Sequence, residues 1–125
     1  MVNFYAPDSV PARFKDRTFY KHNANVTLMR TTAEENAAIG AEIARKVSAA
    51  TGPAAVLLPG RGVSAIDREG QPFDDAAARR ALHDAIRTNL DTVEVRELDL
   101  HINDPEFADA AAQKLLELMK QEAVS

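Results

Sequence analysis

The chain has 125 residues, a formal net charge of −4 and no cysteine, with 46% hydrophobic and 27% charged residues. This composition is typical of one folded domain over residues 1–125, and it excludes disulfides and thiolate chemistry. Few aromatic residues and an acidic balance argue against a nucleic-acid surface, and no apolar run is long enough to cross a membrane. The N-terminus lacks the basic and apolar regions of a signal peptide. We therefore expect a cytoplasmic protein that contacts neither nucleic acid nor membrane.

The first 32 residues are expected to hold little helix. Pro7 and Pro11 disfavour a long regular element, so residues 1–17 are predicted to be an irregular segment. Two short extended segments follow, at residues 18–20 and 25–30, and the second is richer in strand-forming residues.

The middle of the chain predicts a helix and then a buried strand. Thr32 and Glu35 match a capping box, which places a helix over residues 33–51. Gly40 lies in the apolar stripe of this helix and indicates either close approach to a sheet or simply a tolerated cost of about 1 kcal/mol. The apolar run at residues 54–58 is continuous, as in a strand covered on both faces.

The last part of the chain predicts a long loop and two more helices. Residues 59–73 form a connection much longer than a usual strand-to-helix loop, and long loops in compact domains are often functional. The acidic pair at residues 74–75 begins the second helix. Residues 92–100 alternate as a strand near a sheet edge, and Asp104 with Pro105 begins the last helix.

This β-α-β-α-β-α order predicts the α/β class, with a three-layer, Rossmann-like, mostly parallel sheet and helices on both faces. In such sheets ligands bind beyond the carboxyl ends of the strands. That rule brings three loops to one rim, at residues 30–32, 60–67 and 99–104.

The second loop contains the main candidate for anion binding. Gly60, Arg61 and Gly62 could offer backbone N–H groups and a guanidinium to a phosphate or carboxylate. The alternative is a flexible turn with a solvent-facing arginine. The segment matches neither the phosphate-loop pattern nor the dinucleotide-binding pattern.

The other loop residues allow several roles. Ser64 falls one glycine short of a nucleophile elbow, and is expected to cap or to bond a ligand. Asp67 could turn the loop or hold a ribose hydroxyl. His101 could be a metal ligand, a general acid or base, or a structural residue that bonds the neighbouring loop. His22, His83 and the pair Arg79–Arg80 are predicted to lie on the surface.

From these observations the predicted site is a ligand-binding rim, with no metal site and no assigned catalytic residue. Its predicted members are Arg30, Gly60, Arg61, Gly62, Ser64, Asp67, His101, Asn103 and Asp104.

Four segments together carry a family resemblance, at residues 18–23, 26–31, 61–67 and 99–108. In this order they resemble the C-terminal portion of the Tm-1-like ATP-binding proteins, and the likeness covers nearly the whole chain. The resemblance implies that the chain is the C-terminal part of a longer two-domain protein. Its partner would be the N-terminal half, on the same or a separate chain. ATP, the cofactor that the family name implies, would bind that half.

Two classes of function follow from the sequence. The first is a site for a small anionic or nucleotide-like ligand, shared with the other half of the protein. The second is a structural or oligomerisation module, whose exposed sheet edge pairs with that half or with another copy. Whether the site is half of a metabolic enzyme's active site stays open, and we expect a homo-oligomer.

Overall fold

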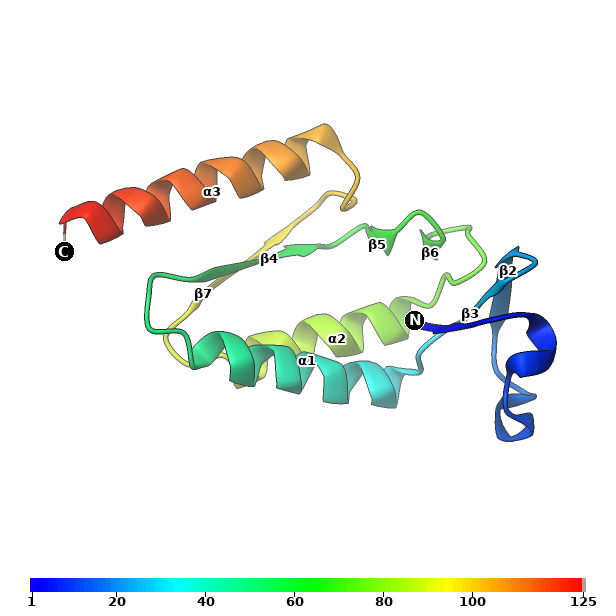
Figure 1. Ribbon diagram of the computed structural model, residues 1–125. Coiled ribbons are helices and arrows are strands. Elements are labelled where there is room, and N and C mark those ends of the chain that lie inside the picture. The colour runs from blue at the N-terminus through cyan, green and yellow to red at the C-terminus, as the bar shows by residue number, and fades with distance from the viewer. Residues whose placement is uncertain (125) are drawn as a thin grey trace. The chain divides into compact units, whose positions relative to one another are not determined.

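The computed structural model describes residues 1–124 as a mixed α/β chain with three α-helices and several small sheets (Figure 1). The backbone forms two compact units, one over Met1–Thr32 and one from Ala33 onward. The sequence indicated one domain, and the backbone boundary falls at the start of the first long helix.

The first unit is built on a three-stranded antiparallel sheet. Strand β3 (Val26–Met29) lies in the middle, between β1 (Val2–Phe4) and β2 (Phe19–Asn23). The segment between β1 and β2 makes two 3-10 turns, at Pro7–Ser9 and Ala12–Phe14. The prolines thus produce single turns rather than a long regular element, as the sequence predicted. The prediction that residues 1–17 are irregular throughout is wrong, because Val2–Phe4 pairs with β3 as a strand.

One face of this sheet is buried. Cross-strand pairs place Lys21 opposite Thr27 and Phe19 opposite Met29, so these four side chains share a face. Thr27 and Met29 are 4% and 2% exposed. On this face the central strand β3 therefore carries the buried side chains, whereas Lys21 on β2 is exposed.

The second unit contains a pair of helices in close contact. Helix α1 (Ala33–Ser48) packs on α2 (Ala76–Asn89), and Gly40 lies at their closest approach. A Cβ atom at Gly40 would lie 2.6 Å from the carbonyl oxygen of Leu82 and 2.8 Å from the Cβ of Ala85. The prediction that Gly40 approaches a sheet is therefore wrong: its neighbour is a helix.

A two-stranded parallel sheet separates these helices from the third. Strand β4 (Ala55–Pro59) pairs with β7 (Glu94–Leu98), and Val56 is opposite Val95. Helix α3 (Pro105–Val124) lies on the other side of this pair from α1 and α2 (Figure 1). Helices on both faces thus agree with the expected α/β class.

The expected single, mostly parallel sheet is not present among the described residues, where β4 and β7 are the one pair of strands in parallel and Gly62 and His101 add a single parallel bridge beyond them. Strand β3 pairs with β1 and β2 instead, and its connection to β2 is the two-residue turn Ala24–Asn25. The Asn25 N–H donates to Oδ1 of Asn23 at 2.9 Å, which closes this turn. A parallel pair needs a crossover of a dozen residues or more, so these two strands form a hairpin instead.

Candidate functional site

The loops that follow β4 and β7 run side by side. The Arg61 N–H donates to the carbonyl of Leu100, and the Ile102 N–H donates to the carbonyl of Gly62, both at 3.0 Å. These bonds continue the parallel ladder past the strand ends. Two of the three loops predicted to share a rim are therefore in contact, while Arg30, from the third, belongs to the unit Met1–Thr32.

Gly62 makes this close approach sterically feasible. Its φ is +149°, and a Cβ there would lie 2.6 Å from Cδ2 of His101 and 2.7 Å from the Cβ of Arg68. Real Cβ atoms do not come so close to carbon. Gly62 begins β5 (Gly62–Ser64), which pairs with β6 (Asp67–Arg68) to form a small hairpin inside the long loop.

His101 holds the two loops together. Its side chain is buried, and Nδ1 accepts a hydrogen bond from the Asn103 N–H at 3.0 Å. Nε2 lies 2.9 Å from the carbonyl oxygen of Ser64, so Nε2 carries the proton and donates it. With both nitrogens engaged, His101 has the structural role among the three that the sequence allowed.

Ser64 and Asp104 also hold the backbone. The Ser64 hydroxyl accepts from the Asp67 N–H at 3.1 Å, within the hairpin turn. Oδ2 of Asp104 accepts from the His101 N–H at 2.8 Å, just before α3 begins. Both side chains therefore stabilise the loop backbone, Ser64 within the hairpin and Asp104 at the start of α3.

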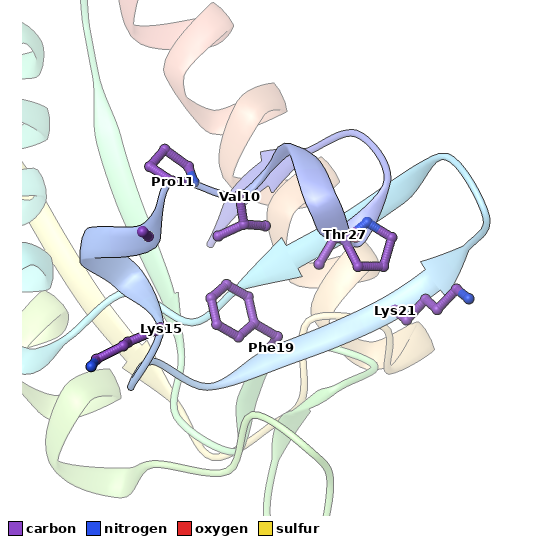
Figure 2. Close-up of a pocket in the computed structure, with 8 residues that line it drawn as sticks. Val10, Pro11, Lys15, Phe19, Lys21 and Thr27 are labelled. Atoms are coloured by element: carbon purple, nitrogen blue, oxygen red, sulfur yellow. The ribbon is translucent and has the colours of Figure 1, made fainter.

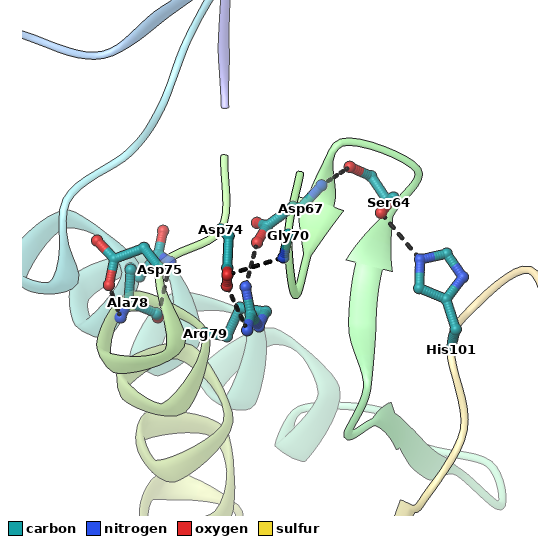
Figure 3. A network of polar contacts seen from close by, with 9 residues as sticks. Ser64, Asp67, Gly70, Asp74, Asp75, Ala78, Arg79 and His101 are labelled. Atoms are coloured by element: carbon teal, nitrogen blue, oxygen red, sulfur yellow. Dashed lines mark hydrogen bonds and ion pairs between the residues drawn. The ribbon is translucent and has the colours of Figure 1, made fainter. Parts of the chain in front are cut away.

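A buried ion-pair cluster connects this hairpin to α2 (Figure 3). Nη1 of Arg79 lies 3.1 Å from Oδ1 of Asp67, and Nη2 lies 3.0 Å from Oδ1 of Asp74. The Asp67 side chain is 2% exposed and that of Arg79 is 12% exposed. Burial alone would lower the pKa of Arg79, but the two carboxylates outweigh it and raise that pKa. The prediction that Arg79 is a solvated surface residue is wrong.

Local capping fixes the start of α2 beside this cluster. Oδ1 of Asp75 accepts from the Ala78 N–H at 2.9 Å, which makes Asp75 the N-cap. Oδ2 of Asp74 accepts from the Gly70 N–H at 3.0 Å, so it also ties the end of the long loop. The acidic pair thus begins the helix as the sequence predicted.

Two adjoining hollows, of about 250 and 570 Å³, lie at the carboxyl ends of β4 and β7 and share Gly60 and Arg79. We refer to them together as the arginine groove. Its lining contains five arginines and two glutamates. The lining residues are Gly60, Arg61, Arg68, Glu69, Ala76, Arg79, Arg80, His83, Arg87 and Glu97.

The arginines of the groove differ in their partners. Arg61 makes two hydrogen bonds with Asp99, at 2.7 and 2.9 Å, and its side chain is 63% exposed. This ion pair raises the pKa of Arg61 and lowers the pKa of Asp99. Within residues 1–124, the side chains of Arg68 and Arg80 have no hydrogen-bond or ion-pair partner.

His83 is part of the groove wall and is 5% exposed, so the prediction of a surface histidine is wrong. Burial lowers its pKa, while Glu97, whose Oε1 is 3.9 Å from Nδ1, opposes the change. Glu97 also pairs with Arg87. The uncharged imidazole therefore has both carboxylate and guanidinium groups near it, among them Glu97 and Arg87.

The structure thus divides the predicted site residues. Gly60 and Arg61 line the groove, and Asn103 is exposed. The remaining members in this unit, Gly62, Ser64, Asp67, His101 and Asp104, hold the loops in place. The contribution of α2 to the groove was not predicted from the sequence. The signal for it was the spacing of Arg79, His83 and Arg87, which recur every four residues and so share one helix face.

Two features are absent from the part of the chain that the structure describes. No group of three or more acidic or histidine side chains is arranged to hold a metal ion in that part of the chain. None of the helices that the structure describes is both long and apolar enough to span a bilayer.

Comparison of the sequence with known proteins shows the family of the chain. Residues 1–119 match the family model described as "Uncharacterised protein family (UPF0261) C-terminal domain". A UPF0261 protein of Rhizobium meliloti is 54% identical over 114 residues, which cover 89% of this chain and 29% of that relative. The ToMV resistance protein Tm-1(GCR237) of Solanum lycopersicum is 40% identical over 121 residues, which cover 94% of this chain and 16% of that protein.

The chain therefore belongs to the UPF0261 family and corresponds to its C-terminal domain. This confirms the resemblance to the C-terminal portion of the Tm-1-like proteins. The chain spans about 29% of the length of the bacterial relative and 16% of the tomato protein.

Proposed function

We propose that this domain binds a small anionic ligand, bearing phosphate or carboxylate groups, in the arginine groove. The observation that carries the proposal is the pair Arg68 and Arg80, which line the groove and have no carboxylate partner among the described residues. The other three arginines of the groove are paired: Arg61 with Asp99, Arg79 with Asp67 and Asp74, and Arg87 with Asp84 and Glu97. Guanidinium groups without a carboxylate partner in a concave region attract anions from solution.

The state of each arginine supports this function. Arg68 and Arg80 have no partner among the described residues, so their guanidinium groups can receive a phosphate or carboxylate in bidentate geometry. Arg79 is already neutralised by Asp67 and Asp74, which makes it part of the wall rather than a ligand contact. Arg61 can exchange its exposed partner Asp99 for a ligand at little cost.

The backbone adds a second favourable field. Ala76, the first residue of α2, lines the groove, so the positive end of the helix dipole lies at its edge. The groove also lies beyond the carboxyl ends of β4 and β7, where ligands of α/β proteins bind. A nucleotide would satisfy the same groups through its phosphates, and in a longer family protein the groove would form one wall of a shared site.

Isothermal titration calorimetry at low salt tests the proposal, with pyrophosphate, ATP and citrate as ligands. Arg68→Ala and Arg80→Ala are each expected to weaken the tightest ligand by about tenfold, the effect of one charge-assisted hydrogen bond. Arg45→Ala is the matched control, because Arg45 is an exposed arginine on α1 whose partner is Glu42. The proposal fails if none of the three anions binds, or if the control weakens binding as much as the groove variants do.

A second function is favoured by an independent observation on α3. Leu115, Leu116 and Met119 are 59%, 57% and 57% exposed and lie within one turn of each other. We propose that this apolar face packs against the rest of a longer family protein, since the chain spans under a third of its bacterial relatives. In that role the domain is a structural module as well as a binding module.

Co-expression tests the second function. The part of the Rhizobium meliloti relative outside the matched segment is expected to co-purify with this chain, and Leu116→Glu with Met119→Glu is expected to abolish co-purification. Glu122→Lys, also on α3, is the control and should leave it intact. Light scattering then separates the alternatives: a stable homo-oligomer that excludes the added segment would contradict the proposal.

A further inference from the structure

The unit Met1–Thr32 contains a hollow of its own, of about 450 Å³ (Figure 2). Its lining combines apolar residues from the proline segment, such as Val10 and Pro11, with Phe19 and Thr27 from the sheet. The volume falls within the range of small-molecule sites in proteins. We propose that this hollow binds a small molecule with an apolar body and one acid group.

The local sequence explains why the hollow exists. Pro7 begins the first 3-10 turn and Pro11 immediately precedes the second, so the chain turns twice over the sheet instead of lying flat on it. Phe14 packs near Phe4, with ring centroids 6.1 Å apart, and this contact anchors one end of the segment. The space beneath Val10 and above Phe19 is left unfilled by the chain (Figure 2).

A buried hydroxyl in the wall has no partner. Thr27 is 4% exposed, and its Oγ1 makes no hydrogen bond within the described part of the chain. Threonine at this central strand position is less favourable than valine unless the hydroxyl is used, because an unpaired buried hydroxyl has lost its bonds to water. In the structure Oγ1 itself is not accessible from the hollow, although Thr27 lines it. Rotation of the side chain about χ1 would turn the hydroxyl into the hollow, where a polar group of the ligand would supply the missing bond.

The positively charged lysines that line the hollow favour a ligand with an acid group. Lys15 and Lys21 line the hollow with their side-chain stems, and Figure 2 shows their ammonium groups directed outward on opposite sides of the hollow. Neither ammonium group has an ion-pair partner among residues 1–124, so both can turn toward a head group at the mouth of the hollow. Arg13 and Arg17 differ, because both guanidinium groups lie over the Phe14 ring, at 4.6 and 5.6 Å. The two free lysines therefore favour an anionic head group, while Val10, Pro11 and Phe19 favour an apolar body.

NMR titration of the ¹⁵N-labelled chain tests this inference, with 3-phenylpropanoate as the acid and 3-phenylpropanol as its uncharged analogue. The acid is expected to shift amide signals within residues 7–27 with a Kd of about 1 mM, the usual strength for so small a ligand. The alcohol is expected to bind about three to ten times more weakly, because it lacks the charge that the lysines recognise.

Two variants separate the contributions. The double variant Lys15→Gln and Lys21→Gln is expected to lower the affinity for the acid to that for the alcohol. Thr27→Val keeps the shape of the side chain, and is expected to weaken the acid severalfold without lowering the melting temperature. Arg13→Gln, on the same segment but outside the lining, is the control and should leave the affinity unchanged.

The inference is overturned if the acid shifts no signal in residues 7–27, or if acid and alcohol bind equally to the unmodified chain. It is also overturned if Thr27→Val and the double lysine variant both bind the acid as the unmodified chain does. Since every residue involved lies within Met1–Thr32, these results are independent of anion binding in the arginine groove.

Discussion

Arg79 and Asp67 form a buried ion pair, with Nη1 and Oδ1 3.1 Å apart and the carboxylate 2% exposed. Asp67 lies in the hairpin that follows β4, and Arg79 lies one turn into α2. This pair therefore fastens the long loop to the helix at the edge of the arginine groove. A buried pair is most costly when only one partner is removed, since the other charge stays uncompensated.

Asp67→Asn is expected to lower the free energy of unfolding by about 1–3 kcal/mol, less than complete loss of a buried partner because Asp74 still neutralises Arg79. Urea denaturation followed by circular dichroism measures the change. Asp84→Asn is the control, because Asp84 pairs with Arg87 at the surface and should change stability little. Equal losses in the two variants would contradict a structural role for the buried pair.

Gly62→Ala is expected to destabilise the chain by about 2–4 kcal/mol, because it combines an unfavourable φ with overlap against His101 and Arg68. Gly52→Ala should change the free energy of unfolding by less than about 0.5 kcal/mol, since nothing lies within 4 Å of the added Cβ. Thermal and urea denaturation of both variants checks the contrast. A loss in Gly52→Ala that matches Gly62→Ala would show that the close approach to His101 is not the cause.

Arg61→Ala is expected to weaken anion binding while leaving the melting temperature unchanged. The side chains of Arg61 and Asp99 are 63% and 83% exposed, and ion pairs at such exposure stabilise a fold very little. Calorimetric titration and a thermal melt of the same sample give both quantities. If affinity and melting temperature fall together, Arg61 braces the loops and does not contact the ligand.

Stability is expected to fall as the pH is lowered from about 6.5 towards 5, because of His83. Burial lowers the pKa of His83 in the folded chain, whereas the unfolded chain keeps the ordinary value and takes up the proton first. Glu97 and Asp84 favour protonation of the folded state, and Arg87 and Arg79 oppose it.

The matched variants are His83→Gln and His22→Gln. Urea denaturation across this pH range should show a shallower loss for His83→Gln, and no change of slope for His22→Gln, whose histidine is exposed. Asp99 and Glu117 have lowered pKa values and therefore act at more acidic pH, below about 4. An unaltered slope in His83→Gln would rule out the buried imidazole as the source.

The helices were predictable from local signals in the sequence. The acidic pair at residues 74–75 and the Asp104–Pro105 pair marked two helix starts, and both starts lie where those signals placed them. The sheet pairing was not predictable in the same way, because it depends on which strands meet in space. The Ala24–Asn25 turn that joins β2 and β3 contains no glycine and none of the residue pairs typical of a hairpin, so the local sequence carried little signal for it.

The sequence predicted which loops meet at the candidate site, but it did not predict which side chains contact one another there. The rule for parallel strands correctly joined the loops at residues 60–67 and 99–104. It could not show that Asp67 pairs with Arg79, because that pairing depends on the rotation of α2 about its own axis. The groove arginines on α2 were missed for the same reason.

The hydrogen bond from the His101 N–H to Asp104 has a mechanical consequence. Asp99, the partner of Arg61, is two residues before His101, and Asp104 immediately precedes α3. A ligand that draws Arg61 away from Asp99 therefore acts on the same short stretch of backbone from which α3 extends. The arginine groove and the 20-residue helix α3 are thus connected through the short backbone segment from Asp99 to Asp104.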